Sequence, residues 1–102
     1  MTKPVRLGPA AEEELRIAED FYEERASLGR DFIAAVREAA RHLAAQPKSF
    51  PLARGVSFQL GVRRCPLRRF PHALFFVELP EEFRVLAVAH DRRRPFYWRQ
   101  RL

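Results

Sequence analysis

The segment Asp91–Arg101 holds the residues of this chain that are best suited to recognise a charged partner. It carries five Arg and three aromatic residues in eleven positions. Arg supplies a rigid fork of N–H donors that fits a phosphate or a carboxylate, and aromatic rings supply faces on which bases or Arg stack. The segment directly follows Phe83–His90, whose apolar pattern predicts a buried strand. A strand that leads into such a cluster indicates a charged binding surface.

His90 with Arg92, Arg93, Arg94 and Tyr97 forms a candidate set for metal-free cleavage of RNA. That reaction needs a base for the 2′-hydroxyl, an acid for the leaving oxygen and cations for the phosphate. Histidine serves either proton-transfer role near neutral pH, and Arg stabilises the charge that develops. The alternative is structural, because a histidine at the end of a strand commonly serves only as a hydrogen-bonding residue.

The remaining histidines and the acids of the N-terminal half lack such a setting. His42 and His72 have no partner group at a useful spacing, so we expect both to face solvent. We expect the acids of the first helix, Glu12–Glu14 among them, to form its solvated face. No spacing typical of metal ligands occurs, and no cofactor is indicated.

A second basic group precedes the last two predicted strands and comprises Arg63, Arg64, Arg68 and Arg69. Strand alternation places Arg64 and Arg68 on one face. This group either binds an anion or keeps an edge strand soluble through its charge, and the sequence favours neither reading.

Two features of the chain have mainly structural interpretations. Aromatic residues near a terminus commonly hold it on a sheet, so we expect Phe96 or Trp98 to anchor the C-terminal segment. Cys65 is the single cysteine, which excludes an internal disulfide. We expect it to be a buried, unreactive thiol.

Length and charge indicate one small globular domain with an anionic partner. The chain has 102 residues and a net charge of +6, and its second half holds eleven of nineteen basic residues but four of thirteen acids. Such asymmetry indicates a nucleic acid or an acidic protein as partner. The chain shows no apolar run of membrane-spanning length and no signal-like start, so we expect a cytoplasmic protein without membrane contact.

The N-terminal half has the periodicity of a strand followed by two helices. Val5–Leu7 predicts a short strand, and Pro9 begins a helix with an apolar stripe from Ala11 to Tyr22. Ser27–Gly29 interrupts this helix, with Gly29 suited to a positive φ. A second helix is predicted from about residue 30 to 45. So short a break predicts an antiparallel helical hairpin.

After a loop over residues 48–61, the C-terminal half predicts three antiparallel strands, namely Val62–Leu67, Ala73–Leu79 and Phe83–His90. Alternation in the last strand places Val85, Ala87 and Ala89 toward the helices. Pro66 predicts an edge strand or a bulge. The predicted class is α+β, with the order β-α-α-β-β-β and a helical hairpin packed on one face of an antiparallel sheet.

Several short motifs also occur in a fixed order along nearly the whole chain. They are Pro-Ala-Ala-Glu-x-x-Leu at Pro9–Leu15, Phe21-Tyr22, Leu28-Gly-Arg-Asp-Phe32, Leu43-x-x-x-Pro47, Arg64-x-x-x-Arg68-x-Phe70-Pro71, Val85-Leu-Ala-Val-Ala-His90 and Arg93-x-Pro95-x-Tyr97-Trp98. Together they resemble the RelE/ParE superfamily of toxins from type II toxin–antitoxin modules. The resemblance implies the same β-α-α-β-β-β fold.

The resemblance also implies one of two targets. RelE-like members cut mRNA on the ribosome with Lys, Arg and Tyr on the sheet and tail, whereas ParE-like members lack that set and poison DNA gyrase. In this sequence the basic pair of the RNase strand falls near Arg64 and Pro66, and the Arg of the next strand falls near Ala73. What survives is an Arg after the last strand, Arg92 or Arg93, and the tail residue Tyr97.

These departures favour a ParE-like toxin that is neutralised by a cognate antitoxin in a hetero-oligomer and acts by binding gyrase. The predicted target- or antitoxin-binding residues are Arg64, Arg68, Arg69, Arg92, Arg93, Arg94, Tyr97, Trp98 and Arg99. The first alternative is a ribosome-dependent mRNA interferase that uses Arg64, His90, Arg92, Arg93 and Tyr97. The second alternative is a non-toxic basic module that binds nucleic acid.

Overall fold

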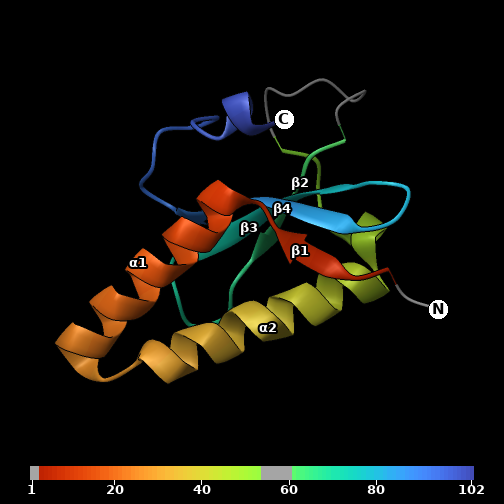
Figure 1. Cartoon of the computed structure of the whole chain (residues 1–102). Helices are drawn as coiled ribbons and strands as arrows, with labels where there is room; N and C mark the ends of the chain where they lie inside the picture. Colours follow the sequence, from red (N-terminus) through yellow and green to blue (C-terminus); the bar gives the residue numbers. More distant parts are fainter. Residues whose placement is uncertain (1–2, 54–60) are drawn as a thin grey trace.

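The computed structural model describes residues 3–53 and 61–102, and it shows a helical hairpin packed on a sheet (Figure 1). The elements are β1 (Val5–Leu7), α1 (Pro9–Ala26), α2 (Gly29–Ala45), the 3-10 turn η1 (Pro47–Ser49), β2 (Arg63–Pro66), β3 (His72–Glu78), β4 (Phe83–His90) and the 3-10 turn η2 (Arg99–Arg101). The predicted order is confirmed, and the strand bounds agree to within one residue. The predicted loop over residues 48–61 lies partly outside the described residues.

The sheet has four strands in the order β1-β4-β3-β2. β3 pairs antiparallel with both β2 and β4, as predicted. β1 differs, because it pairs parallel with β4 through Val5–Leu7 and Phe83–Val85. The sheet is therefore mixed. Two reversals of direction separate β2 from β4, so these strands run the same way, and β1 joins the edge of β4 in that common direction.

The connection between the helices depends on a close approach. Ser27 adopts the left-handed conformation with φ 56°, and the N–H groups of Ser27 and Leu28 donate to carbonyls of the last turn of α1. The predicted positive φ of Gly29 is wrong, since Gly29 begins α2. A Cβ at Gly29 would lie 3.0 Å from Glu23 Cβ and 3.2 Å from the carbonyl oxygen of Glu19, so the close approach of α1 favours glycine there.

One core lies between the helices and the sheet. α1 contributes Ala11, α2 contributes Phe32 and Leu43, and the sheet contributes Leu74 and Val85, each at most 1% exposed. A second buried cluster lies on the opposite face of the sheet. It contains Ala53, Val62, Leu86, Ala87, Ala89 and Trp98. The sheet is thus covered on both faces, by the helices and by the C-terminal residues 91–102, called the tail below (Figure 1).

A β-bulge at Leu86 changes which residues of β4 face the helices and which face the tail. Phe76 pairs with Val85 while its neighbour Phe75 pairs with Ala87, so Leu86 is the extra residue. The side-chain alternation restarts after the bulge. Ala87 therefore packs under the tail, as does Ala89, and the prediction that these two face the helices is wrong. The same prediction is confirmed for Val85.

β2 lies at the end of the sheet, as Pro66 predicted. Its outer side is partly covered by residues 51–53, because the N–H of Arg64 donates to Pro51 O and Leu52 bridges to Arg63. Within the described residues, neither α1 nor α2 has the length and apolar composition that a membrane span requires.

Candidate binding site between the sheet and the tail

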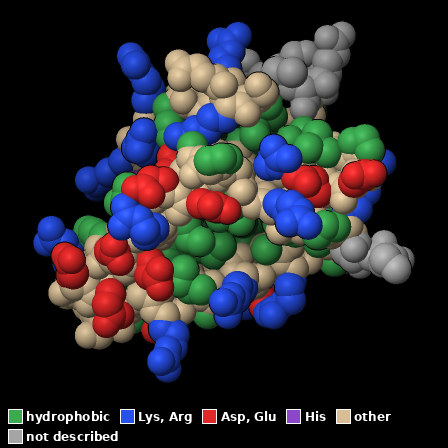
Figure 2. All heavy atoms as spheres, in the orientation of Figure 1, with side chains coloured by type: hydrophobic (Ala, Val, Ile, Leu, Met, Phe, Trp, Pro, Cys, Tyr) green, Lys and Arg blue, Asp and Glu red, His purple; other side chains and the backbone are tan. Residues whose placement is uncertain are grey.

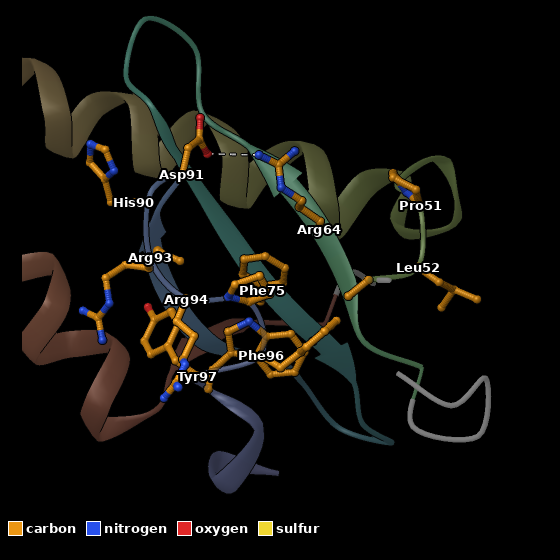
Figure 3. Close-up of a pocket in the computed structure, with 14 residues that line it drawn as sticks. Pro51, Leu52, Arg64, Phe75, His90, Asp91, Arg93, Arg94, Phe96 and Tyr97 are labelled. Atoms are coloured by element: carbon orange, nitrogen blue, oxygen red, sulfur yellow. Dashed lines mark hydrogen bonds and ion pairs between the residues drawn. The ribbon is translucent and has the colours of Figure 1, made fainter. Parts of the chain in front are cut away.

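A groove of about 550 Å³ lies on the sheet face that carries the tail. Its lining combines apolar side chains, including Leu52, Phe75 and Ala89, with the guanidinium groups of Arg64, Arg93 and Arg94 at its rim. We call it the tail groove. Figure 3 shows Arg64 on the β2 side, Arg93 and Arg94 on the tail side and Phe75 between them. An apolar floor with a cationic rim suits a ligand that has an apolar group and negative charges.

One ion pair crosses the rim of the tail groove. Arg64 Nη2 lies 3.1 Å from Asp91 Oδ1, and both side chains are partly exposed (Figure 3). Asp91 is the one acidic residue among the described residues that line this groove. A pair with this exposure contributes at most about 1 kcal/mol to stability, so it mainly orients the Arg64 side chain.

The tail is anchored by Trp98, which is 1% exposed. This confirms the predicted aromatic anchor. Its ring stacks on Phe75 with the centroids 5.0 Å apart. The turn that brings the indole inward uses a left-handed residue, Phe96, with φ 64°.

Glu14 of α1 holds the tail from the side of the helix. One carboxylate oxygen accepts hydrogen bonds from the N–H of Val88 (3.0 Å) and from Arg101 (2.9 Å). The other accepts from the hydroxyl of Tyr97 (2.7 Å) and from Arg101 (3.1 Å). Burial, followed by the hydrogen bond to Glu14, raises the pKa of Tyr97 well above its usual value.

Glu14 and Arg101 are functional candidates that sequence reasoning missed. The prediction that the acids of α1 are all solvated is wrong for Glu14, whose side chain is 14% exposed. A signal was present in the spacing, because Glu14 lies three residues after Ala11 and four before Ala18, on the apolar stripe. Its partners could not be read from the sequence, since they are 83 and 87 residues away.

His90 and His72 form an edge-to-face pair at the end of the sheet. Their ring centroids lie 5.0 Å apart, and His90 Nδ1 accepts a hydrogen bond from the N–H of Arg92. The predicted solvent exposure of His72 is wrong, because it is 6% exposed and packs on Tyr22 and Phe32. Burial lowers the pKa of His72 to about 4. His42 faces solvent as predicted.

Two other sequence predictions concern metal binding and thiol chemistry. In residues 3–53 and 61–102, no group of three His, Cys, Asp or Glu side chains could hold a metal ion. Cys65 is buried as predicted, and burial raises its pKa to about 11. A thiol so hard to ionise is a poor nucleophile.

The structure gathers part of the predicted binding set and leaves the rest apart. Arg64, His90, Arg93, Arg94, Tyr97 and Trp98 all line the tail groove. Arg68 and Arg69 lie in the turn between β2 and β3, and Arg69 approaches Asp31 of α2 at 3.9 Å. Arg92 and Arg99 are exposed residues of the tail outside the lining. Figure 2 shows Lys and Arg side chains gathered over the tail and acids over the far end of the helical hairpin.

The comparison with protein families decides the class of this chain. Residues 5–95 match the family described as the ParE toxin of the type II toxin–antitoxin system, parDE. The chain belongs to the ParE toxin family. The resemblance stated from the motifs is thereby confirmed. The matched region ends at residue 95, so Tyr97, Trp98 and Arg101 lie outside it.

The fold is also similar to that of a solved structure. A chain described as the chromosomal ParDE TA system from P. aeruginosa superposes with a TM-score of 0.69 at 18% identity, covering 86% of this chain and 95% of that chain. This likeness supports the α+β fold predicted from periodicity. Among curated proteins, no match to this chain was found.

Proposed function

We propose that this ParE-family protein inhibits growth by binding DNA gyrase in the cytoplasm and that a cognate antitoxin neutralises it. The observation that supports binding over catalysis is the hydrogen bonding and raised pKa of Tyr97. Its hydroxyl donates to Glu14 at 2.7 Å and its pKa is raised, so it is a poor source of a proton for a substrate. The site offers cations and an apolar floor, which serve recognition.

The positions where the resemblance places RNase residues support the same conclusion. Pro66 of β2 has no side chain that could contact a phosphate through charge, and its pairing partner on β3 is Ala73, which is 1% exposed. A ribosome-dependent nuclease would thus lack two of its cations on the sheet. His90 and Arg93 remain, and they define the alternative outcome of the test below.

The lining of the tail groove suits an antitoxin segment that has acidic residues and an apolar side chain. Leu52, Phe75 and Ala89 give this groove apolar surface, and the guanidinium groups of Arg64, Arg93 and Arg94 lie beside it. An aliphatic or aromatic side chain of a peptide would pack on this apolar surface, and Arg64 and Arg93 would bind flanking carboxylates. The similar structure comes from a ParDE toxin–antitoxin system, which agrees with a protein partner.

Induced expression in a bacterium tests the target. Growth, a DNA-damage reporter and primer extension on cellular mRNA are scored together after induction. We expect growth arrest with an active reporter and intact mRNA. Codon-associated cuts in mRNA with a silent reporter would overturn the gyrase proposal in favour of the interferase.

Co-expression with the small protein encoded by the adjacent gene tests the partner. We expect a stable complex on purification and restored growth. Arg64→Ala combined with Arg94→Ala should weaken that complex, whereas Arg37→Ala combined with Arg41→Ala on α2 is the charge-matched control. Equal loss in both double variants would show a general effect of net charge and would exclude the tail groove as the contact.

A further inference from the structure

Among the side chains of the described residues, the carboxylate of Glu14 accepts an unusually large number of hydrogen bonds. It is 14% exposed, and each of its oxygens accepts two hydrogen bonds. Arg101 binds it through both terminal nitrogens, a bidentate geometry that fixes orientation as well as distance. A carboxylate so enclosed depends on these donors, because water has little access to replace them.

This cluster completes an edge of the sheet that β1 does not reach. β1 pairs with β4 only as far as Val85. Beyond it, Arg101 donates to the carbonyl of Leu86 at 3.0 Å, and Glu14 accepts from the N–H of Val88. Side chains from α1 and the tail thus take the place of strand partners just after the bulge.

A chain of contacts leads from Glu14 to the rim of the tail groove. Glu14 fixes the hydroxyl of Tyr97, and the guanidinium of Arg93 lies 3.9 Å from the centroid of the Tyr97 ring. Arg93 lines the tail groove and also a smaller hollow of about 320 Å³ between α1 and the end of β4. Arg93 therefore borders both hollows, and within the described residues it forms no ion pair.

We propose that Glu14 is a positioning residue of the binding site, which holds the tail as a fixed wall of the groove and, through Tyr97, sets Arg93 at its rim. The consequence for partner binding rests on the function proposed above. The positioning itself does not, because it follows from contacts within this chain. Trp98 supplies the apolar attachment of the tail, and Glu14 supplies the orientation of the residues on either side of it.

Proteolysis of the tail measures the positioning directly. Trypsin cleavage after Arg99 is followed by mass spectrometry in wild type, Glu14→Gln, Arg101→Ala and the double variant, while far-UV circular dichroism reports the folded core. Glu13→Ala is the matched control, since Glu13 is the exposed neighbour and pairs with Arg16 on the helix surface. The emission of Trp98, the single tryptophan, reports whether the tail stays docked.

We expect cleavage about tenfold faster or more in both single variants than in wild type, because proteolysis follows the population of the open tail. The effect of the double variant should be smaller than the two single effects combined, because both changes remove the shared Glu14–Arg101 interaction. Rates within about twofold of Glu13→Ala, or additive effects in the double variant, would overturn the proposal. Should Glu14→Gln unfold the core, Arg101→Ala and Tyr97→Phe decide the matter, because both changes are confined to the tail.

A binding measurement separates positioning from a merely structural role. The probe is a dye-labelled peptide of alternating glutamate and leucine, and its affinity is compared for wild type, Glu14→Gln, Arg93→Ala and both together. We expect Glu14→Gln to weaken binding and the double variant to bind no more weakly than Arg93→Ala. Full additivity would show that Glu14 does not act through Arg93. A peptide that fails to bind wild type would refute the proposed partner chemistry while the proteolysis still decides the role of Glu14.

Discussion

The indole of Trp98 stacks on the ring of Phe75 with an interplanar angle of 29°. One residue belongs to the tail and the other to β3, and Phe75 is also part of the groove floor. The contact that attaches the tail therefore also shapes the surface on which a ligand would lie. The Phe75–Trp98 pair therefore contributes both to the stability of the fold and to the shape of the binding surface.

Replacing Trp98 by Ala should destabilise the domain by about 3–5 kcal/mol, because it removes a large, fully buried aromatic side chain. Urea unfolding followed by far-UV circular dichroism measures the change. Leu102→Ala is the control, since Leu102 is about half exposed and should change stability little. A loss below about 1 kcal/mol for Trp98→Ala would mean that the tail contributes little to the fold.

Replacing Val85 by Asp should destabilise the domain by several kcal/mol, since Val85 is 0% exposed between the sheet and the helices. Arg68→Asp, in an exposed turn, is the control and should stay within about 0.5 kcal/mol of wild type. Thermal unfolding of both variants gives the comparison. A folded Val85→Asp protein with an unchanged midpoint would contradict the assignment of Val85 to the helix side.

Stability should fall between pH 6.5 and pH 4 in a manner that depends on His72. Burial, with a smaller contribution from His90, lowers the pKa of His72 from 6.5 to about 4. The unfolded chain then binds a proton that the folded chain does not, so the stability is complete above pH 6.5 and is lost as the pH falls through this window. The expected loss is about 3 kcal/mol, at about 1.36 kcal/mol per pKa unit.

Urea unfolding at several pH values checks this dependence. His72→Phe keeps the aromatic contacts with Tyr22 and Phe32 and should flatten the curve between pH 4 and 6.5. His42→Ala, at an exposed position of α2, should leave its slope unchanged. Parallel curves for wild type and His72→Phe would assign the acid sensitivity to other groups.

Converting Arg92, Arg93 and Arg94 to Ala together should weaken toxicity and partner binding with little effect on folding. All three are exposed, and the stacking of Arg93 on Tyr97 is worth about 0.5–1 kcal/mol at such a site. The control converts Arg30, Arg37 and Arg41 of the hairpin, which lowers the net charge equally. Toxicity retained in the tail variant, or lost equally in both, would remove these residues from the site.

The fold could be predicted because its signals are local. Helix periodicity, the Pro positions and the turns between strands each depend on a few neighbouring residues, and the structure agrees with them. The faces of β4 after Leu86 could not be predicted, because a single extra residue in one strand reverses the alternation without changing the composition.

The candidate site was predicted in part, for a related reason. The Arg and aromatic residues of the tail were visible as a cluster, and the structure places Arg93, Arg94, Tyr97 and Trp98 along one groove. The side chains that hold them come from distant positions. The burial of His72 against Tyr22, and the contact of Glu14 with Arg101, both join segments whose spacing in the sequence carries no signal.

The parallel pairing of β1 with β4 has a consequence for the order in which the molecule assembles. Val5 pairs with Phe83, and Glu14 binds Arg101, so both contacts join residues that are separated by most of the sequence. Contacts between such distant positions close late, because the entropy of long loops opposes them until other structure has formed. The helical hairpin and the β2–β3 pair need only local closure and can form earlier. A partly folded chain would therefore have helices and a hairpin but no completed groove, so the ability to bind would arise in the final step of folding.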